Sequence, residues 1–196
     1  MEFYGCVLLA MKCSVEKVSG WVFFGWRYFD LRKMLDEFVN GNNLPYFVFS
    51  KNYDKYFFFD NVLFSDLDVL RGIVGLAKAA GDIFVRYFRF DDFGGEKLVL
   101  VDDLIDFVSS DEKRRVDDFI FSGGWIFSGS GAWGAFQRIP VGLGVVGVSP
   151  GIGLDESVFD KDVFFCIDDW SKESLDILVA NYGEDYVAIL LKNYVA

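Results

Sequence analysis

Residues 82–101 read DIFVRYFRFDDFGGEKLVLV. Two runs rich in aromatic and β-branched residues, Asp82–Phe90 and Glu96–Val101, flank the turn sequence Asp91-Asp92-Phe93-Gly94-Gly95. Aromatic and β-branched side chains are enriched in strands, whereas aspartate and glycine favour turns. This stretch therefore predicts a β-hairpin, which pairs two antiparallel strands of a sheet.

A helix is predicted directly before the hairpin, over Ser65–Ala80. Ser65 can cap its first turn, and Gly81 favours its termination. Apolar residues recur at helical spacing, and they form a predicted buried stripe of Leu67, Leu70, Ile73, Val74 and Ala77.

The residues that follow the hairpin are acidic. Asp111–Phe121 predicts a helix with Ser109 or Ser110 as its N-cap. Asp102–Val108 is ambiguous, with a short helix as one interpretation.

The composition changes at Ser122. From Gly123 to Leu154 the single charged residue is Arg138, and half of the chain's 20 glycines lie here. Glycine disfavours helix, so this segment is expected to form glycine-bearing strands with bulges or a long ordered loop.

These elements together predict an α+β fold. The sheet is expected to be mixed or antiparallel and to be packed by about three to five helices. A glycine-rich β or loop segment lies near 123–154, and one domain spans 1–196 with a candidate sub-boundary near Ser122. The remaining predicted elements are strands at Phe3–Met11, Gly20–Phe29, Tyr46–Ser50, Tyr56–Asp60 and Val163–Ile167, a helix at Asp30–Val39, a helix from Asp169 or Ser171 to Tyr182, and a strand or helix at Tyr186–Tyr194.

The glycine-rich segment contains two G-x-G-x-x-G patterns, at Gly129-Gly131-Gly134 and at Gly142-Gly144-Gly147. A dinucleotide site requires such a pattern to open a helix whose N-terminus holds the pyrophosphate. Pro140 and Pro150 follow too closely for a useful helix to begin. The glycines are therefore predicted to serve tight turns and close packing.

The chain is strongly acidic, with a formal net charge of -11. Residues 1–60 carry no net charge, so the excess lies in residues 61–122, with 13 acidic and 8 basic side chains, and in residues 123–196, with 10 and 4. Binding to nucleic acid or to an anionic membrane requires the opposite sign. A cationic protein partner is favoured, and solubility alone is the simpler interpretation.

The chain has no histidine and three cysteines, Cys6, Cys13 and Cys166. Histidine-dependent triads and the common zinc sites are therefore excluded, and no cofactor or metal is predicted. Sparse cysteines, and the absence of a signal-peptide pattern, predict a cytoplasmic protein. Chemistry that uses only carboxylates stays open, either as a glycosidase pair or as a Mg²⁺ site.

Acidic residues gather in doublets such as Asp91-Asp92 and Asp102-Asp103, and many aspartates follow aromatic strands, as in Phe59-Asp60 and Phe90-Asp91. Each doublet taken alone is explained by a turn or a helix cap. Taken together, aromatics and carboxylates suit binding to a basic protein surface. The predicted partner-binding residues are Asp91, Asp92, Asp102, Asp103, Asp106, Asp117 and Asp118.

Three acidic aromatic segments, Tyr87–Asp92, Leu98–Asp106 and Phe164–Trp170, give the chain a recognisable character. In this character it resembles bacterial immunity proteins of toxin–immunity systems, including those of contact-dependent inhibition and polymorphic toxins. The resemblance implies a non-enzymatic inhibitor that occludes the active site of a cognate toxin domain, often a basic nuclease. Two alternatives are a carboxylate-dependent hydrolase or Mg²⁺-dependent enzyme, and a structural or phage-type accessory protein that assembles through residues 123–154.

Overall fold

The computed structural model describes residues 15–18, 21–24, 42–50, 52–90, 95–114, 123–138, 142–153, 158–167 and 170–194. Two predicted elements, the strand at Phe3–Met11 and the helix at Asp30–Val39, lie outside the described residues. Within the predicted strand Gly20–Phe29, residues Trp21–Phe24 form β2, which pairs antiparallel with β1 (Val15–Val18).

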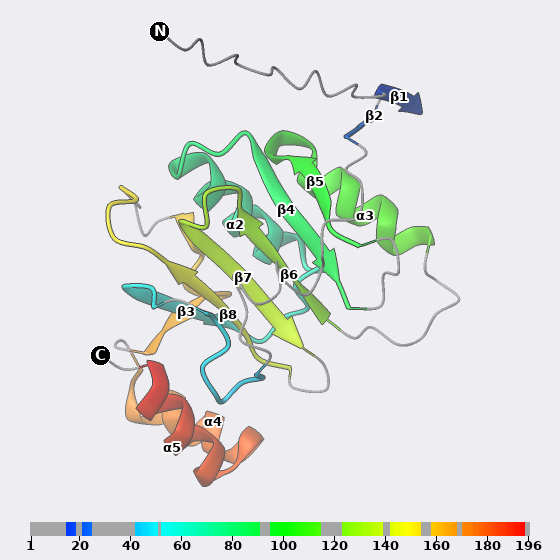
Figure 1. Cartoon of the computed structure of the whole chain (residues 1–196). Coiled ribbons are helices and arrows are strands. Elements are labelled where there is room, and N and C mark those ends of the chain that lie inside the picture. Colours follow the sequence, from blue (N-terminus) through cyan, green and yellow to red (C-terminus); the bar gives the residue numbers. More distant parts are fainter. Residues whose placement is uncertain are drawn as a thin grey trace, which may run out of the picture.

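The central feature is a seven-stranded antiparallel sheet in the order β5-β4-β6-β7-β8-β3-β9 (Figure 1). Its strands are β3 (Lys55–Phe59), β4 (Phe84–Arg89), β5 (Lys97–Leu100), β6 (Gly123–Ser128), β7 (Trp133–Arg138), β8 (Gly144–Val148) and β9 (Phe165–Cys166). β4 pairs with β6, so strands from both sides of Ser122 share one sheet. The predicted hairpin is confirmed as the β4–β5 pair.

Helices pack on this sheet, which confirms the predicted α+β class. They are α2 (Leu67–Ala79), the 3-10 helix η1 (Val101–Asp103), α3 (Leu104–Arg114), α4 (Lys172–Tyr182) and α5 (Glu184–Tyr194). Figure 1 shows α3 beside β5 at one end of the sheet and α4 and α5 at the other end. No helix in the described part of the chain is long and apolar enough to cross a membrane.

The core has two parts, one on each face of the sheet. On one face, residues of α2 and α3 pack against strand residues such as Tyr87, Ile126 and Trp133. On the other face, Leu190 and Tyr194 of α5 and the segment 44–53 pack against residues such as Trp125 and Phe136. Alternate side chains of one strand therefore enter different core clusters, as the period of a β-strand requires.

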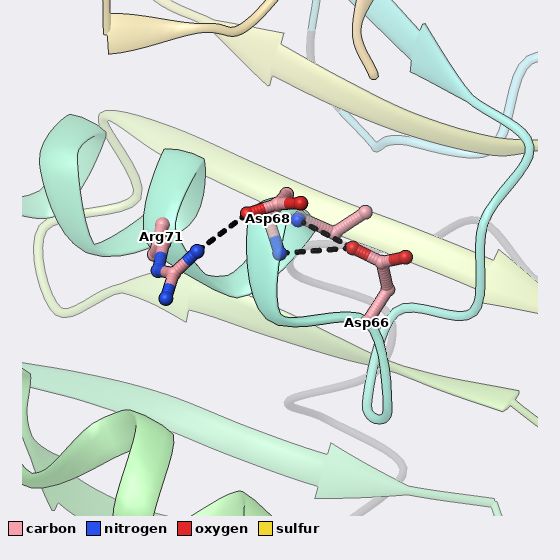
Figure 2. A network of polar contacts seen from close by, with 4 residues as sticks. Asp66, Asp68 and Arg71 are labelled. Carbon is pink, nitrogen blue, oxygen red and sulfur yellow. Dashed lines mark hydrogen bonds and ion pairs between the residues drawn. The ribbon is translucent and has the colours of Figure 1, made fainter. Parts of the chain in front are cut away.

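The N-terminus of α2 differs from the prediction. Asp66, and not Ser65, is the N-cap: its Oδ1 accepts hydrogen bonds from the backbone nitrogens of Asp68 (2.9 Å) and Val69 (3.0 Å) (Figure 2). Asp68 in turn pairs with Arg71 at 2.7 Å. The helix therefore begins at Leu67, whose side chain stays 46% exposed although the predicted stripe placed it in the core.

The predicted strand Tyr46–Ser50 is irregular, and Phe49 alone forms a bridge. Side chains take over the hydrogen bonds that a strand would make. The Val48 N–H donates to the Tyr194 hydroxyl at 3.0 Å, and this hydroxyl donates to the carbonyl of Tyr46 at 3.1 Å. β3 pairs with β8 and β9 and forms no ladder with Tyr46–Ser50.

The structure corrects one further boundary and decides two assignments that the sequence left open. α3 begins at Leu104, so Ser109 and Ser110 lie inside the helix and do not cap it. The ambiguous segment 102–108 is helical, because it forms most of η1 and the first turns of α3. Tyr186–Tyr194 belongs to a helix, α5, which was one of its two predicted states.

The glycine-rich segment contributes β6, β7 and β8. A Cβ atom on Gly134 would lie less than 3.0 Å from the ring of Phe127, the residue opposite it on β6. A Cβ atom on Gly144 would meet the ring of Phe59, opposite it on β3, in the same way. Large aromatic side chains thus lie flat over these glycines, and the described residues of both G-x-G-x-x-G patterns form strands and turns.

Candidate functional site

β5 is the outermost strand at one end of the sheet, and no described strand pairs with its outer edge. The Val101 N–H donates to the carbonyl of Ile83 at 3.0 Å, and Val99 lies opposite Val85 in the same register. Hydrogen-bonded and non-hydrogen-bonded pairs alternate along an antiparallel ladder. The backbone N–H and C=O groups of Leu98 and Leu100 therefore point away from β4.

Three large apolar side chains are exposed at this end of the sheet. Ile83 is 70% exposed, Leu98 40% and Leu100 36%. Val99, between the two leucines, is buried in the core cluster that includes residues of α3. Because successive side chains of a strand alternate, Leu98 and Leu100 lie on the sheet face opposite α3.

Acidic residues follow β5 directly, in η1 and the first turn of α3. Asp102 and Asp106 are exposed, and Asp103 is half-buried. Asp102 forms an ion pair with Lys78 at 2.8 Å, but the two side chains are 82% and 58% exposed. An exposed pair of this kind contributes only about 0–1 kcal/mol, so a partner's cation could replace Lys78 at little cost. We call Ile83, Leu98, Leu100, Asp102, Asp103 and Asp106 together the β5 edge surface.

A buried polar cluster fixes α3 to β4 and β5 beneath this surface. The Tyr87 hydroxyl donates to Asp111 Oδ2 at 3.1 Å, and Lys97 Nζ lies 3.5 Å from Asp111 Oδ1. Lys97 also lies 5.7 Å from the ring centroid of Phe107 in α3. Burial raises the pKa of Tyr87, and the charge of Asp111 raises it further, so the phenol stays protonated and acts as a donor.

The structure brings together three of the seven predicted partner-binding residues, namely Asp102, Asp103 and Asp106. The other four, Asp91, Asp92, Asp117 and Asp118, lie outside the described residues.

Sequence reasoning missed the exposed apolar residues. Phe59, one of the aromatic residues that directly precede an acid, is fully buried, and Phe90 is half-buried. The apolar part of the β5 edge surface is therefore aliphatic. Leu98-Val99-Leu100 is a continuous apolar run, so the sequence pattern gave no signal that two of these side chains are exposed.

A hollow of about 380 Å³ lies at the other end of the sheet, between β3, β9 and α5. Its lining includes Tyr53, Tyr56 and Tyr194, and among the described lining residues Asp54 is the single carboxylate. The Tyr194 hydroxyl holds the segment 46–48, as described above, and the Tyr56 hydroxyl accepts from the Tyr53 N–H at 2.8 Å. These hydroxyls serve the structure, and the described lining does not supply the two acids of a glycosidase pair.

The described part of the chain also contains no candidate metal-binding site. No group of three or more histidine, cysteine, aspartate or glutamate side chains gathers there in an arrangement that could hold a metal ion.

Buried tyrosines make the stability of the protein sensitive to high pH. Burial is the first cause of a raised pKa at Tyr53, Tyr56, Tyr87, Tyr182, Tyr186 and Tyr194, relative to an ordinary value of 10.0. The unfolded chain loses these protons near pH 10 while the folded chain keeps them, so their contribution is complete below pH 10 and is lost above it.

We therefore expect the free energy of unfolding to fall above pH 10. The fall should be roughly 1.4 kcal/mol per pH unit for each fully buried tyrosine, and Tyr87→Phe should reduce it by one such step. Urea unfolding at pH 8 to 11.5, with tyrosinate absorbance recorded in parallel, measures both effects. Identical tyrosinate titrations of the folded and the urea-unfolded chain would contradict the prediction.

Comparisons of the chain with protein-family models, with curated proteins and with solved structures found no match.

Proposed function

We propose that this chain is an immunity or inhibitor protein that binds and neutralises a cognate toxin domain with a basic surface. The β5 edge surface is its binding site. One observation carries the proposal: the edge strand β5, with its exposed leucines Leu98 and Leu100, leads directly in the chain into the acids of η1 and α3.

The two kinds of residue have different roles in such an interface. Covering the apolar side chains removes them from water, which supplies binding free energy that depends little on salt. The carboxylates of Asp102, Asp103 and Asp106 attract a cationic partner over a longer range and raise the association rate. The chain's net charge of -11 acts in the same direction.

The proposed inhibition follows from this charge. A toxin domain that cleaves nucleic acid carries a basic surface, because it must bind phosphates. An acidic protein surface competes for the same cations, and the body of the seven-stranded sheet then blocks access of the substrate. The likeness in character to bacterial immunity proteins supports this choice of partner.

The test is a charge reversal of Asp102, Asp103 and Asp106 to lysine in one variant. With a toxin domain recovered by pull-down from the native host as the partner, we expect the association rate constant at low salt to fall at least roughly tenfold. Its dependence on ionic strength should also weaken. Stopped-flow mixing at several salt concentrations measures both quantities.

A matched control reverses Asp162, Asp176 and Asp185, three exposed acids of other segments, and changes the net charge by the same amount. The control should retain most of the association rate. Equal rates and equal salt dependence in the parent, the variant and the control would sink the proposal.

A further inference from the structure

We infer that the partner binds by adding a strand to the outer edge of β5, through an extended segment in which basic and apolar residues alternate. This inference names the binding mode and partner chemistry of the β5 edge surface, and in that respect it rests on the proposed function.

The first argument comes from the backbone of β5. The N–H and C=O groups of Leu98 and Leu100 point away from β4, and no described strand forms hydrogen bonds with them. An unpaired edge of this kind is a template for another strand, and main-chain hydrogen bonds supply part of the affinity when a peptide adds to it.

The second argument concerns the lysine that would usually protect such an edge. Proteins often guard an edge strand with a lysine that points into solvent. The one lysine of β5, Lys97, is instead only 23% exposed, since it lies between Asp111 and the rings of Tyr87 and Phe107. Its charge is held on the α3 side of the sheet, and the apolar side chains of Leu98 and Leu100 stay accessible.

The third argument gives the sequence of the partner segment. Side chains of an added strand point alternately to the two faces of the sheet. On the face opposite α3 they meet Leu98 and Leu100, which favour apolar residues. Asp102, Asp103 and Asp106 follow β5 directly in η1 and the first turn of α3, and their charge favours lysine or arginine on the α3 face of the segment. The complementary segment therefore alternates basic and apolar residues.

The same charges argue against a second copy of this chain as the occupant. Edge-to-edge pairing of two β5 strands would bring two sets of Asp102, Asp103 and Asp106 to one interface. Like charges at close range oppose this association, whereas a basic segment neutralises them.

The test uses the full chain and a capped octapeptide of alternating lysine and valine, KVKVKVKV. We expect the peptide to bind and to slow hydrogen exchange of the Leu98 and Leu100 amides at least roughly tenfold. The Val99 amide, which already bonds to β4, should change much less. A glutamate–valine peptide of the same length should not bind, and a lysine–valine peptide with alternate N-methylated amides should bind roughly tenfold more weakly.

Leu98→Pro tests the edge from the side of the protein. The Leu98 N–H takes no part in the β4–β5 ladder, so proline is tolerated there while it blocks an added strand. We expect a roughly tenfold or greater loss of peptide binding with little change in the urea midpoint. Leu98→Ala loses apolar contact but keeps the N–H, so it should weaken binding less than Leu98→Pro and still show exchange protection in the complex. If Leu98→Pro does not fold, the comparison of the two lysine–valine peptides on the parent chain still decides the result.

Three outcomes would overturn the inference. One is peptide binding without protection of the Leu98 and Leu100 amides, and another is equal binding of the N-methylated peptide. The third is protection of these amides in the isolated chain, which means that a second copy or another part of this chain already covers the edge. If Leu98→Pro leaves toxin association unchanged while the charge reversal slows it, the proposed function stands and strand addition fails.

Discussion

Replacing Gly124 with alanine is expected to lower the free energy of unfolding by about 3 kcal/mol, at the upper end of the usual cost of overpacking. A Cβ atom at this position would lie less than 3.0 Å from the carbonyl oxygen of Phe88 and the Cα of Arg89. Both atoms belong to the backbone of β4, which is held by β5 on one side and β6 on the other. Because the clash is with backbone atoms, a rotamer change cannot relieve it. β4 also cannot move away without loss of ladder hydrogen bonds.

Gly129→Ala is the matched control for this prediction. Gly129 follows β6 in the turn to β7, and the nearest atom to a Cβ there is 4.0 Å away. Its free energy of unfolding should stay within about 0.5 kcal/mol of the parent. Urea unfolding followed by tryptophan fluorescence measures both variants. Equal stabilities of Gly124→Ala and Gly129→Ala would show that the close approach of β6 to β4 does not constrain the sheet.

The contrast between these two glycines shows what the sequence could and could not predict. Glycine content excluded a helix after Ser122, because backbone entropy acts locally. Whether a given glycine is needed for close packing or for a turn depends on the strand beside it, and Phe88 is far from Gly124 in the sequence. The β4–β5 hairpin was predictable for the opposite reason, since its two strands and its turn are contiguous.

The order of the strands in the sheet was the feature of the fold that the sequence predicted least. β3 lies between β8 and β9, at sequence separations that no local pattern encodes. Tyr46–Ser50 has the composition of a strand, but the Tyr194 hydroxyl binds the Val48 N–H and the Tyr46 carbonyl, and Phe49 alone in this segment forms a bridge. That hydroxyl arrives on α5, so the outcome depends on the last helix of the described chain.

The unpredicted strand order also explains why only half of the candidate site could be predicted. The acids Asp102, Asp103 and Asp106 were identifiable from charge and from their place after a strand. Exposure of Leu98 and Leu100 was not, because an apolar residue in a strand is buried or exposed according to whether another strand or helix covers it. Only the sheet order shows that β5 is an edge strand.

Replacing Gln137 with alanine is expected to destabilise the protein by about 4 kcal/mol, because it removes a cavity-filling side chain and leaves several buried groups unpaired. Gln137 is fully buried on β7. Its Oε1 accepts from the Leu63 N–H at 2.8 Å, and its Nε2 donates to the carbonyls of Asn61 (2.9 Å) and Gly142 (2.7 Å). One side chain thus joins the connection between β3 and α2 to the residues just before β8.

Two further substitutions separate hydrogen bonding from packing at this position. Gln137→Met fills most of the volume but makes none of the three bonds, so a loss close to that of alanine would assign the effect to the unpaired backbone groups. Gln137→Glu keeps an acceptor for Leu63 but directs a carboxylate oxygen at two carbonyl oxygens. We expect it to be at least as destabilising as alanine at pH 7.

The pH dependence of Gln137→Glu gives the sharpest form of the test. Burial and the two carbonyl oxygens raise the pKa of the introduced carboxyl in the folded state above its unfolded value. Its protonated form regains a donor, so the stability relative to the parent should be highest below the unfolded pKa, about 4.3, and should fall as the pH rises through the folded pKa. Urea unfolding between pH 4 and 8 measures the difference. A variant whose deficit does not change over this range would contradict the donor role of the Gln137 amide, and the connection 61–63 would then be held by packing alone.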